Sequence, residues 1–220
     1  MPPTCRFDFG PLASAYDRWY ETAEGRRHDV AQQEIVQALL PSPAGGNGRL
    51  LDVGCGTGHW SRFFVQLGYE VTGIDVASEM VEVARARQLS SCRFYIADAM
   101  DLPFPSRSFD VVCAMAVLEF VADVPQVCTE MVRCLNPGGC LVIGTLNRLA
   151  EINRERIASH AAPYESAQMF APEELRHLLK PFGEVRLCLS KEPGTNDNDQ
   201  PGAFIVARVT TPAGYSQPLA

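Results

Sequence analysis

The sequence predicts a doubly wound α/β domain, in which a mostly parallel sheet carries helices on both faces. Apolar runs of strand length alternate with helical patterns from residue 49 onward, which is typical of parallel strands joined by helical crossovers. The run Phe109–Met115 is almost continuously apolar, as expected for a strand that is buried on both faces. A glycine-rich turn, residues 54–58, directly follows the first expected strand.

Composition limits the class of protein. The chain has 220 residues with a formal net charge of −7, which suits one domain and disfavours binding to nucleic acid or to an anionic membrane. It shows no leader pattern at its start and no membrane-length apolar stretch. Its eight cysteines form no CxxC pair, so we expect buried thiols, no metal site and a cytoplasmic location.

The first half of the chain predicts a helical region followed by three strands. Residues 11–40 have a helical pattern with a joint at Gly25, and the turn residues 41–48 end it. Strand 50–53 and a helix that stops at Gly68 follow. Strand 70–75, a helix over 78–88 and strand 92–97 come next, and Ser78 is placed to cap the helix.

The second half repeats this alternation. Strand 109–115 precedes a helix that Asp123 caps, and residues 136–139 turn the chain into strand 140–146. After the polar stretch 148–169, Pro172 opens a helix that ends near Pro181. A loop without a helix, 193–201, joins strands 184–190 and 203–209, so we expect the last of the seven strands to be antiparallel.

The turn after the first strand is the principal candidate for a ligand site. Its spacing is GxGxG, from Gly54 to Gly58, and glycine lets backbone N–H groups approach a ligand closely. His59 occupies the third-glycine position of a dinucleotide-binding turn, and no Lys-Ser/Thr pair follows as in a phosphate loop. A tight turn without a ligand is the competing interpretation.

Two carboxylates follow the next two strands. Asp75 could accept hydrogen bonds from a ribose diol, and Asp98 could accept one from an adenine amino group. Helix capping or solvation explains either residue alone. Since the carboxyl ends of parallel strands share one edge of a sheet, the three signals together favour a nucleoside-type ligand there.

Over residues 50–147 the chain resembles the class I S-adenosylmethionine-dependent methyltransferases, specifically the methyltransferase type 11 family. The matching segments are 51–58 (LDVGCGTG), 73–80 (GIDVASEM), 97–110 (ADAMDLPFPSRSFD), 117–121 and 135–139. Segments 16–25 and 170–175 extend the likeness to about residues 7–209. It implies a Rossmann-like fold within a single domain, residues 1–220, with a helical cap (1–47), a cofactor-binding core (48–147), an acceptor-side segment (148–169), a C-terminal helix with strands (170–210) and a tail (211–220).

The resemblance implies S-adenosyl-L-methionine as cofactor. The glycine turn would face its methionine part, and Asp75 would hold the ribose. Val76 would flank the adenine and Asp98 would take its amino group, while Tyr16 would close over the cofactor. The implied cofactor-binding residues are Tyr16, Asp52, Gly54, Cys55, Gly56, Gly58, Asp75, Val76, Met80, Asp98, Ala99, Met100 and Met115.

The implied activity is methyl transfer by in-line displacement. The N-terminal cap and the segment 148–169 are short, which favours a small-molecule acceptor, with a protein acceptor as the alternative. No residue is assigned as catalytic, and the acceptor, its accepting atom and the oligomeric state are not predicted. His59 is expected to point to solvent and Trp60 to form core or pocket wall. The candidates for the acceptor side are Tyr16, Tyr20, His28, Glu119, Phe120, His160 and Tyr164.

Three other functions compete with this one. A non-catalytic protein that binds S-adenosylmethionine or S-adenosylhomocysteine would keep the same glycines and Asp75. A nicotinamide-dependent oxidoreductase is disfavoured by His59 and by the lack of a Tyr-xxx-Lys pair. A nucleic-acid binder is disfavoured by the acidic charge.

Overall fold

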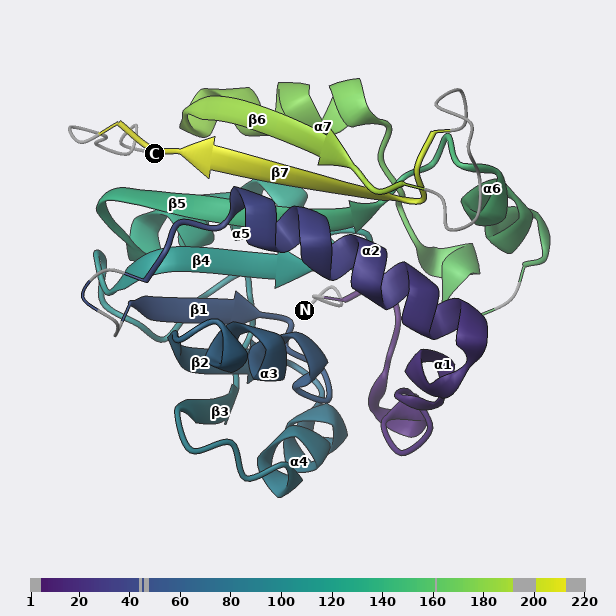
Figure 1. Cartoon of the computed structure of the whole chain (residues 1–220), viewed down its shortest axis with the longest axis horizontal. Helices are drawn as coiled ribbons and strands as arrows, with labels where there is room; N and C mark the ends of the chain where they lie inside the picture. The colour runs from purple at the N-terminus through teal and green to yellow at the C-terminus, as the bar shows by residue number, and fades with distance from the viewer. Residues whose placement is uncertain (1–4, 44, 46–47, 161, 192–200, 213–220) are drawn as a thin grey trace.

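The computed structural model describes residues 5–43, 45, 48–160, 162–191 and 201–212. Most of the predicted loop 193–201 and of the tail 211–220 therefore lies outside the described residues. Seven strands form one sheet in the order β3-β2-β1-β4-β5-β7-β6 (Figure 1). The strands are β1 (Arg49–Val53), β2 (Glu70–Asp75), β3 (Cys92–Ile96), β4 (Phe109–Met115), β5 (Leu135–Leu146), β6 (Glu184–Leu189) and β7 (Phe204–Thr210).

The sheet is mixed in the predicted way. Strands β3, β2, β1, β4 and β5 pair in parallel, and β7 is antiparallel to both β5 and β6. The strand order reverses between β1 and β4. From β1 the chain builds outward through β2 to β3, and it then returns to place β4 on the other side of β1. In an open sheet of this kind, the carboxyl ends of the strands at the reversal form the crevice in which ligands bind.

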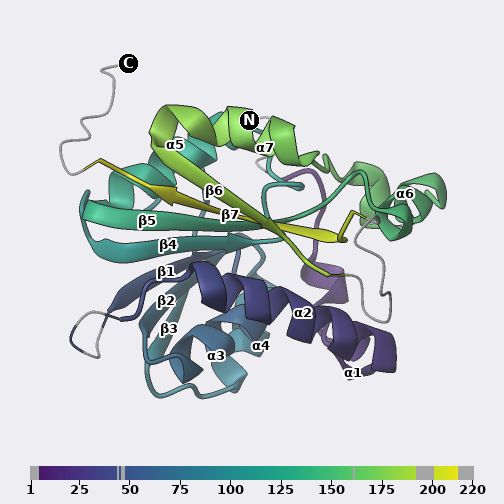
Figure 2. The same ribbon diagram turned by 45° about the horizontal axis from the view of Figure 1, so that its top comes forward.

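Helices cover both faces of the sheet, which confirms the doubly wound prediction (Figure 2). One face carries α2 (Ala23–Leu39), α3 (His59–Gln66) and α4 (Ser78–Ala86), and the other carries α5 (Val124–Cys134) and α7 (Pro172–Leu179). Each face has its own apolar core, so the central strands are buried on both sides. The largest fully buried side chains include Leu50, Leu51, Phe64, Ile74, Met131, Leu141, Leu175 and Phe204.

The N-terminal region consists of η1 (Gly10–Leu12), α1 (Arg18–Glu21) and α2, and its break is not where the sequence placed it. The chain leaves the helical conformation at Thr22, whose hydroxyl oxygen accepts a hydrogen bond from the Gly25 N–H at 2.9 Å. Gly25 instead lies inside the first turn of α2, so the predicted joint at Gly25 is wrong. Its missing side chain has a packing reason, because a Cβ there would lie 1.9 Å from the Trp19 carbonyl oxygen.

Two capping predictions have different outcomes. The Asp123 side chain accepts from the Gln126 N–H at 3.0 Å and caps α5 as predicted. Ser78 is already inside α4, and its hydroxyl donates to Glu79 rather than capping the helix. The N–H of the actual N-cap residue, Ala77, donates to the Asp75 carboxylate at 2.9 Å.

Two segments differ from the predicted elements. Strand β5 begins at Leu135, and the expected turn 136–139 is an irregularity in its pairing with β4. The polar stretch 148–169 contains α6 (Glu151–Ala158) and η3 (Tyr164–Ser166). Asn153 anchors α6 by donating to the carbonyl oxygens of Asn147 (2.9 Å) and Ala203 (2.8 Å).

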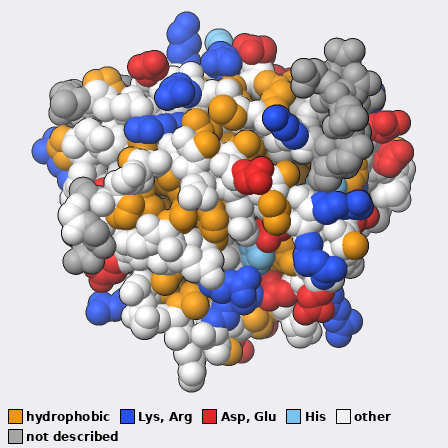
Figure 3. All heavy atoms as spheres, viewed as in Figure 1, with side chains coloured by type: hydrophobic (Ala, Val, Ile, Leu, Met, Phe, Trp, Pro, Cys, Tyr) orange, Lys and Arg blue, Asp and Glu red, His pale blue; other side chains and the backbone are white. Residues whose placement is uncertain are grey.

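On the face shown in Figure 3, basic side chains are interspersed with acidic ones. Among the cysteines, Cys55, Cys113, Cys128, Cys134 and Cys140 are buried, and all eight are free thiols. No helix in the described part of the chain is long and apolar enough to span a membrane.

We predict that Gly25→Ala destabilises the protein, although alanine favours helix more than glycine does. The added Cβ would collide with the Trp19 carbonyl oxygen, and such overpacking costs about 1–3 kcal/mol. Urea unfolding measures the loss. Glu34→Ala, at an exposed site on the same helix, is the control and should leave the free energy of unfolding nearly unchanged. A Gly25→Ala protein at least as stable as the wild type would contradict this packing.

Candidate cofactor and acceptor cavities

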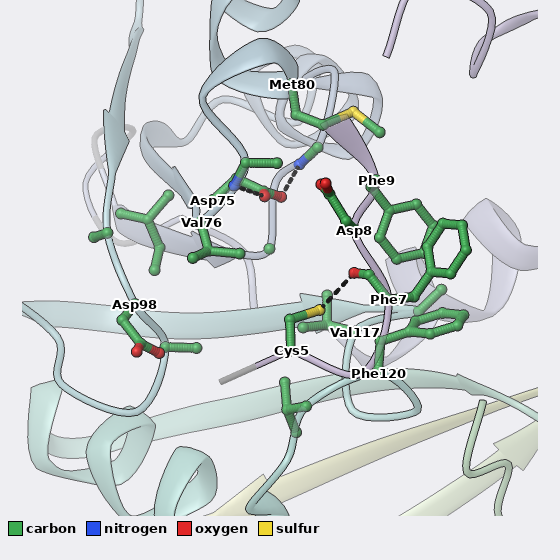
Figure 4. A pocket seen from close by; sticks show the side chains of 18 of the residues that line it. Cys5, Phe7, Asp8, Phe9, Asp75, Val76, Met80, Asp98, Val117 and Phe120 are labelled. Atoms are coloured by element: carbon green, nitrogen blue, oxygen red, sulfur yellow. Dashed lines mark hydrogen bonds between the residues drawn. The ribbon is translucent and has the colours of Figure 1, made fainter. Parts of the chain in front are cut away.

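A cavity of about 380 Å³ lies at the carboxyl ends of β1, β2 and β4, where the strand order reverses (Figure 4). Strands and loops far apart in the sequence contribute to its wall. Nine of the thirteen residues expected to bind a cofactor line this cavity: Tyr16, Gly54, Gly56, Asp75, Val76, Met80, Asp98, Ala99 and Met115.

The glycine turn is held against the loop that follows β4. Gly54 has a φ of +69°, and a Cβ on it would lie 2.4 Å from the Val117 side chain. Any other residue there would therefore be strained and would also displace Val117. At Gly56, by contrast, a Cβ would meet no atom within 4 Å, because this part of the turn borders the cavity.

The two strand-end carboxylates are fixed by backbone N–H groups. Asp75 accepts from the N–H of Gly56 at 2.8 Å and from that of Ala77 at 2.9 Å. Burial raises the pKa of Asp75, although these backbone hydrogen bonds oppose the rise. Asp98 accepts from the Met100 N–H at 2.9 Å. A carboxylate has about four acceptor positions, so both side chains keep capacity for a ligand.

The other four expected residues do not line this cavity. Asp52 is buried beneath the glycine turn, where it accepts from the Ser61 hydroxyl at 2.6 Å, and burial raises its pKa to about 7. Gly58 precedes α3 beside Phe94, and Met100 packs against the main core. Cys55 lines a second, adjoining cavity.

Residues 5–9 form part of the wall that the sequence analysis missed. Cys5 makes an antiparallel bridge with Val121, and the Arg6 N–H donates to the Phe120 carbonyl at 2.6 Å. Cys5, Phe7, Asp8 and Phe9 consequently face the cavity (Figure 4). The alternation of Phe7 and Phe9 was the available signal, but nothing local indicates that these residues pair with the loop after β4.

The second cavity, about 330 Å³ in volume, adjoins the first on the side of the N-terminal helices. Both cavities are lined by Tyr16, Gly54, Gly56, Met115 and Phe120, so they meet along a common wall. The wall of the second cavity is mainly aromatic. Its aromatic rings belong to Phe9, Tyr16, Trp19, Tyr20, Trp60, Phe120, Tyr164 and Phe204, together with His59.

Comparison with known proteins gives a consistent picture. Residues 51–143 match the family model of a methyltransferase domain. The malonyl-[acyl-carrier protein] O-methyltransferase of Serratia marcescens is 33% identical over 139 residues, which cover 61% of this chain and 52% of the relative. The ubiquinone biosynthesis O-methyltransferase of Xanthomonas axonopodis pv. citri is 37% identical over 162 residues, covering 67% of this chain and 66% of the relative.

A solved structure matches over nearly the whole chain. It is a Thermotoga maritima S-adenosylmethionine-dependent methyltransferase, titled a possible histamine N-methyltransferase, with a TM-score of 0.72 and 27% identity. The match covers 92% of this chain and 98% of that structure. The chain belongs to the class I S-adenosylmethionine-dependent methyltransferases. It spans about half the length of the first curated relatives, the malonyl-[acyl-carrier protein] O-methyltransferases.

The prediction that the His59 side chain points to solvent is wrong. His59 is buried, its Nε2 lies 2.8 Å from Asp29 Oδ1, and its ring stacks on Tyr20 with centroids 3.8 Å apart. The helical position alone suggested an exposed side chain. The docking of α1 and α2 over the start of α3 buries it, and that contact is tertiary.

The remaining acceptor-side candidates divide into two groups. Tyr20 and Tyr164 line the second cavity, as do Tyr16 and Phe120, which were described above. His28 stacks on Trp19 at 6.0 Å between centroids, and His160 is exposed. Neither histidine is among the residues that line the two cavities.

Glu119 is fully buried in the loop after β4. Its Oε1 accepts from the Leu146 N–H at 2.6 Å, and it lines neither cavity. Burial raises its pKa to about 7, although the Leu146 N–H and the nearby Thr145 hydroxyl oppose the rise. Within the described residues, its Oε2 makes no hydrogen bond of normal geometry. These contacts indicate that the Glu119 carboxyl group supports the loop after β4 and does not contact a ligand in either cavity.

Asp17 joins three parts of the chain at the edge of the second cavity. It accepts a hydrogen bond from the Thr57 hydroxyl at 2.7 Å and forms an ion pair with Arg87. Thr57 belongs to the glycine turn and Arg87 follows α4, whereas Asp17 immediately follows Tyr16. The N-terminal region is therefore attached directly to the glycine turn.

We predict that Glu119→Gln makes folding less dependent on pH. Because the pKa is about 7 in the folded protein and 4.5 in a model compound, the stabilising contribution of the proton is complete below pH 4.5. It is lost as the pH rises through 7. The glutamine variant should therefore be more stable than the wild type at about pH 8, by roughly 1–3 kcal/mol, and not at about pH 4.

Urea unfolding at both pH values measures the effect. Glu155→Gln, on the exposed side of α6, is the matched control and should leave the pH dependence unchanged. A Glu119→Gln variant whose stability relative to the wild type is the same at both pH values would contradict the buried protonated carboxyl.

Proposed function

We propose that this chain catalyses methyl transfer from S-adenosylmethionine to a small-molecule acceptor. The observation that carries the proposal is the common wall of the two cavities, because methyl transfer needs two ligands held side by side. A protein that only binds the cofactor has no use for the second cavity. The proposal therefore favours an enzyme over a non-catalytic binder.

The first cavity, which Asp75 and Asp98 line, is the proposed cofactor site. Asp75 would accept from the ribose hydroxyls, and Asp98 from the adenine amino group. Val76, Met80 and Ala99 supply apolar surface for the adenine between them.

Gly54 and Gly56 would border the methionine part of the cofactor, with Tyr16 and Met115 on the side of the second cavity. The four expected residues that do not line this cavity would support it indirectly, by fixing the glycine turn and the loop after β3. These residues are Asp52, Cys55, Gly58 and Met100.

The described residues fit this cofactor. The open space beside Gly56 would be filled by any side chain at that position, so glycine keeps the backbone accessible. Both carboxylates have unused acceptor capacity, and their partners in the proposal are hydroxyl and amino donors. Val117, against which Gly54 packs, supplies apolar surface to the same cavity.

The second cavity is the proposed acceptor site. When bound, S-adenosylmethionine supplies an electrophilic methyl group on a sulfonium centre, which needs no acid from the protein. The task of the chain is to align the acceptor atom with that methyl group and to exclude water. Aromatic residues from α1, α3 and the loop after β4 surround the common wall and would perform both tasks.

The relatives support a small acceptor in general and no single compound. One is named for ubiquinone biosynthesis, another for a malonyl group on acyl-carrier protein, and a third is described as a possible histamine N-methyltransferase. They differ in accepting atom as well as in acceptor. We therefore propose no accepting atom, and no residue of this chain is assigned as a general base.

Calorimetric titration with S-adenosylhomocysteine, with NAD as a parallel control, tests the cofactor. We expect micromolar binding of the former alone; binding of NAD alone, or of neither, refutes the proposed site. Transfer from labelled S-adenosylmethionine to a panel of small acceptors then tests catalysis. Tight cofactor binding without transfer to any acceptor in the panel would favour the non-catalytic binder.

Asp75→Asn should weaken S-adenosylhomocysteine binding by about 1–3 kcal/mol, because the ribose hydroxyls lose a charged acceptor. Calorimetry gives the affinity, and thermal unfolding shows whether the variant folds. Asp101→Asn is the matched control, since Asp101 is an exposed acid on the same side of the sheet. If both variants keep wild-type affinity, Asp75 does not hold the ribose.

Tyr16→Phe should reduce turnover or cofactor retention severalfold with little change in melting temperature. Tyr16 lines both cavities, and burial raises the pKa of its hydroxyl, which therefore stays protonated. Tyr69→Phe is the opposite control. The Tyr69 hydroxyl donates to the Pro41 carbonyl away from both cavities, so its loss should affect stability alone. A purely thermal effect at Tyr16 would make that residue a packing residue.

A further inference from the structure

We infer that the acceptor is an aromatic carboxylate, whose ring lies among the aromatic side chains of the second cavity and whose anionic group binds Arg156. This inference rests on the proposed function and names the substrate class of the same site. It depends on the charges around the cavity, on the contacts of Arg156 and on the composition of the wall.

Arg156, on α6, is the single Lys or Arg residue among the described residues that line the second cavity. None of those lining residues is an aspartate or a glutamate, although the chain as a whole is acidic. His59, the other basic group, already has the Asp29 carboxylate as its partner at 2.8 Å. The cavity therefore offers one unmatched positive charge, which favours an anion and disfavours a protonated amine.

The guanidinium of Arg156 is held in place and still has free donors. It lies 5.1 Å from the Tyr164 ring centroid and 5.9 Å from that of Trp19, which restricts its plane. One of its N–H groups donates to Asn153 Oδ1 at 3.0 Å. Within the described part of the chain it forms no ion pair and no second hydrogen bond, so a fork of donors remains for a carboxylate.

The same contacts argue against a cationic acceptor. Aromatic cavities without acids can bind ammonium groups through cation–π contacts. Here Trp19 and Tyr164 are already occupied by the cation of the protein itself, and a second cation beside Arg156 would be repelled. The Phe, Tyr and Trp rings left for the acceptor are those of Phe9, Tyr16, Tyr20, Trp60, Phe120 and Phe204, which suit an uncharged aromatic ring.

The position of the Arg156 guanidinium also suits an acceptor that extends across the second cavity. The Arg156 guanidinium, from α6, lies over the rings of Trp19, in α1, and of Tyr164, in η3, and α6 and α1 lie on the same side of the molecule (Figure 1). Met115 and Gly56 lie at the common wall with the proposed cofactor site. A carboxylate on Arg156 would therefore leave the rest of the acceptor directed toward that wall.

The two tryptophans of the chain, Trp19 and Trp60, both line this cavity, so their fluorescence reports binding without any activity. We would saturate the protein with S-adenosylhomocysteine and titrate it with 3-phenylpropanoate, 3-phenylpropanamide and 3-phenylpropylamine. These compounds share a skeleton, differ in charge and do not absorb where tryptophan is excited. We expect the anion to bind at least ten-fold more tightly than the amide, and the amine most weakly.

Arg156→Gln should remove the preference for the anion and leave amide binding within about two-fold of the wild type. Arg154→Gln is the matched control, because Arg154 is an exposed residue on the same helix outside the cavity. It should keep the full preference, which excludes an effect of net charge alone.

Equal binding of the three compounds, a preference for the amine, or an equal loss in both arginine variants would overturn the inference. So would binding of none of them by protein that still binds S-adenosylhomocysteine. In each of these cases the proposed function stands. Failure to bind S-adenosylhomocysteine at all refutes the proposed function, and this inference with it.

Discussion

The hydrogen bond between the Gly56 N–H and the Asp75 carboxylate joins the ends of two neighbouring strands, and the geometry of both cavities depends on it. Asp75 ends β2, and the glycine turn follows β1, so this bond fixes the turn relative to the sheet edge. The close approach of Gly54 to Val117 adds the loop after β4 to the same unit. A side chain in place of Gly54 would separate the two loops that border the cofactor cavity.

The N-terminal region completes the site by contacts that are distant in sequence. Residues 5–9 pair with the loop after β4, and Asp17 binds Thr57 of the glycine turn and Arg87. Asp29 contacts His59 at the start of α3. Because these contacts involve buried or half-buried polar groups, each would leave an unpaired group if the region detached. The region therefore forms a wall of the site and not a separate appendage.

Burial and charge are distributed differently in the two cavities. The proposed cofactor cavity is lined by three carboxylates, as suits a ligand rich in hydroxyl and amino donors, and the second cavity has aromatic rings and one arginine. Asp52 and Glu119 lie behind these walls, with pKa values raised to about 7 by burial. They line neither cavity, and their buried carboxyl groups make the stability of the fold, more than the site itself, sensitive to pH.

The sequence by itself determined a doubly wound, mostly parallel sheet of seven strands with an antiparallel last strand, and its family resemblance named nine of the residues that line the first cavity. The sheet could be predicted because apolar periodicity and glycine turns are local signals, whereas most of the nine residues follow from the segments that match the family. The sequence misplaced the break at Gly25, the cap at Ser78 and the side chain of His59, and it did not predict α6. The docking of α1 and α2 on the start of α3 buried His59, and the Thr22 hydroxyl set the break before α2. The Asp75 carboxylate holds the N–H at the start of α4 in place of a Ser78 cap, and Asn153 anchors α6 to Asn147 and Ala203. Since the contacts of His59 and of α6 join residues far apart in the chain, only the tertiary structure revealed the aromatic cavity and placed Arg156 in it.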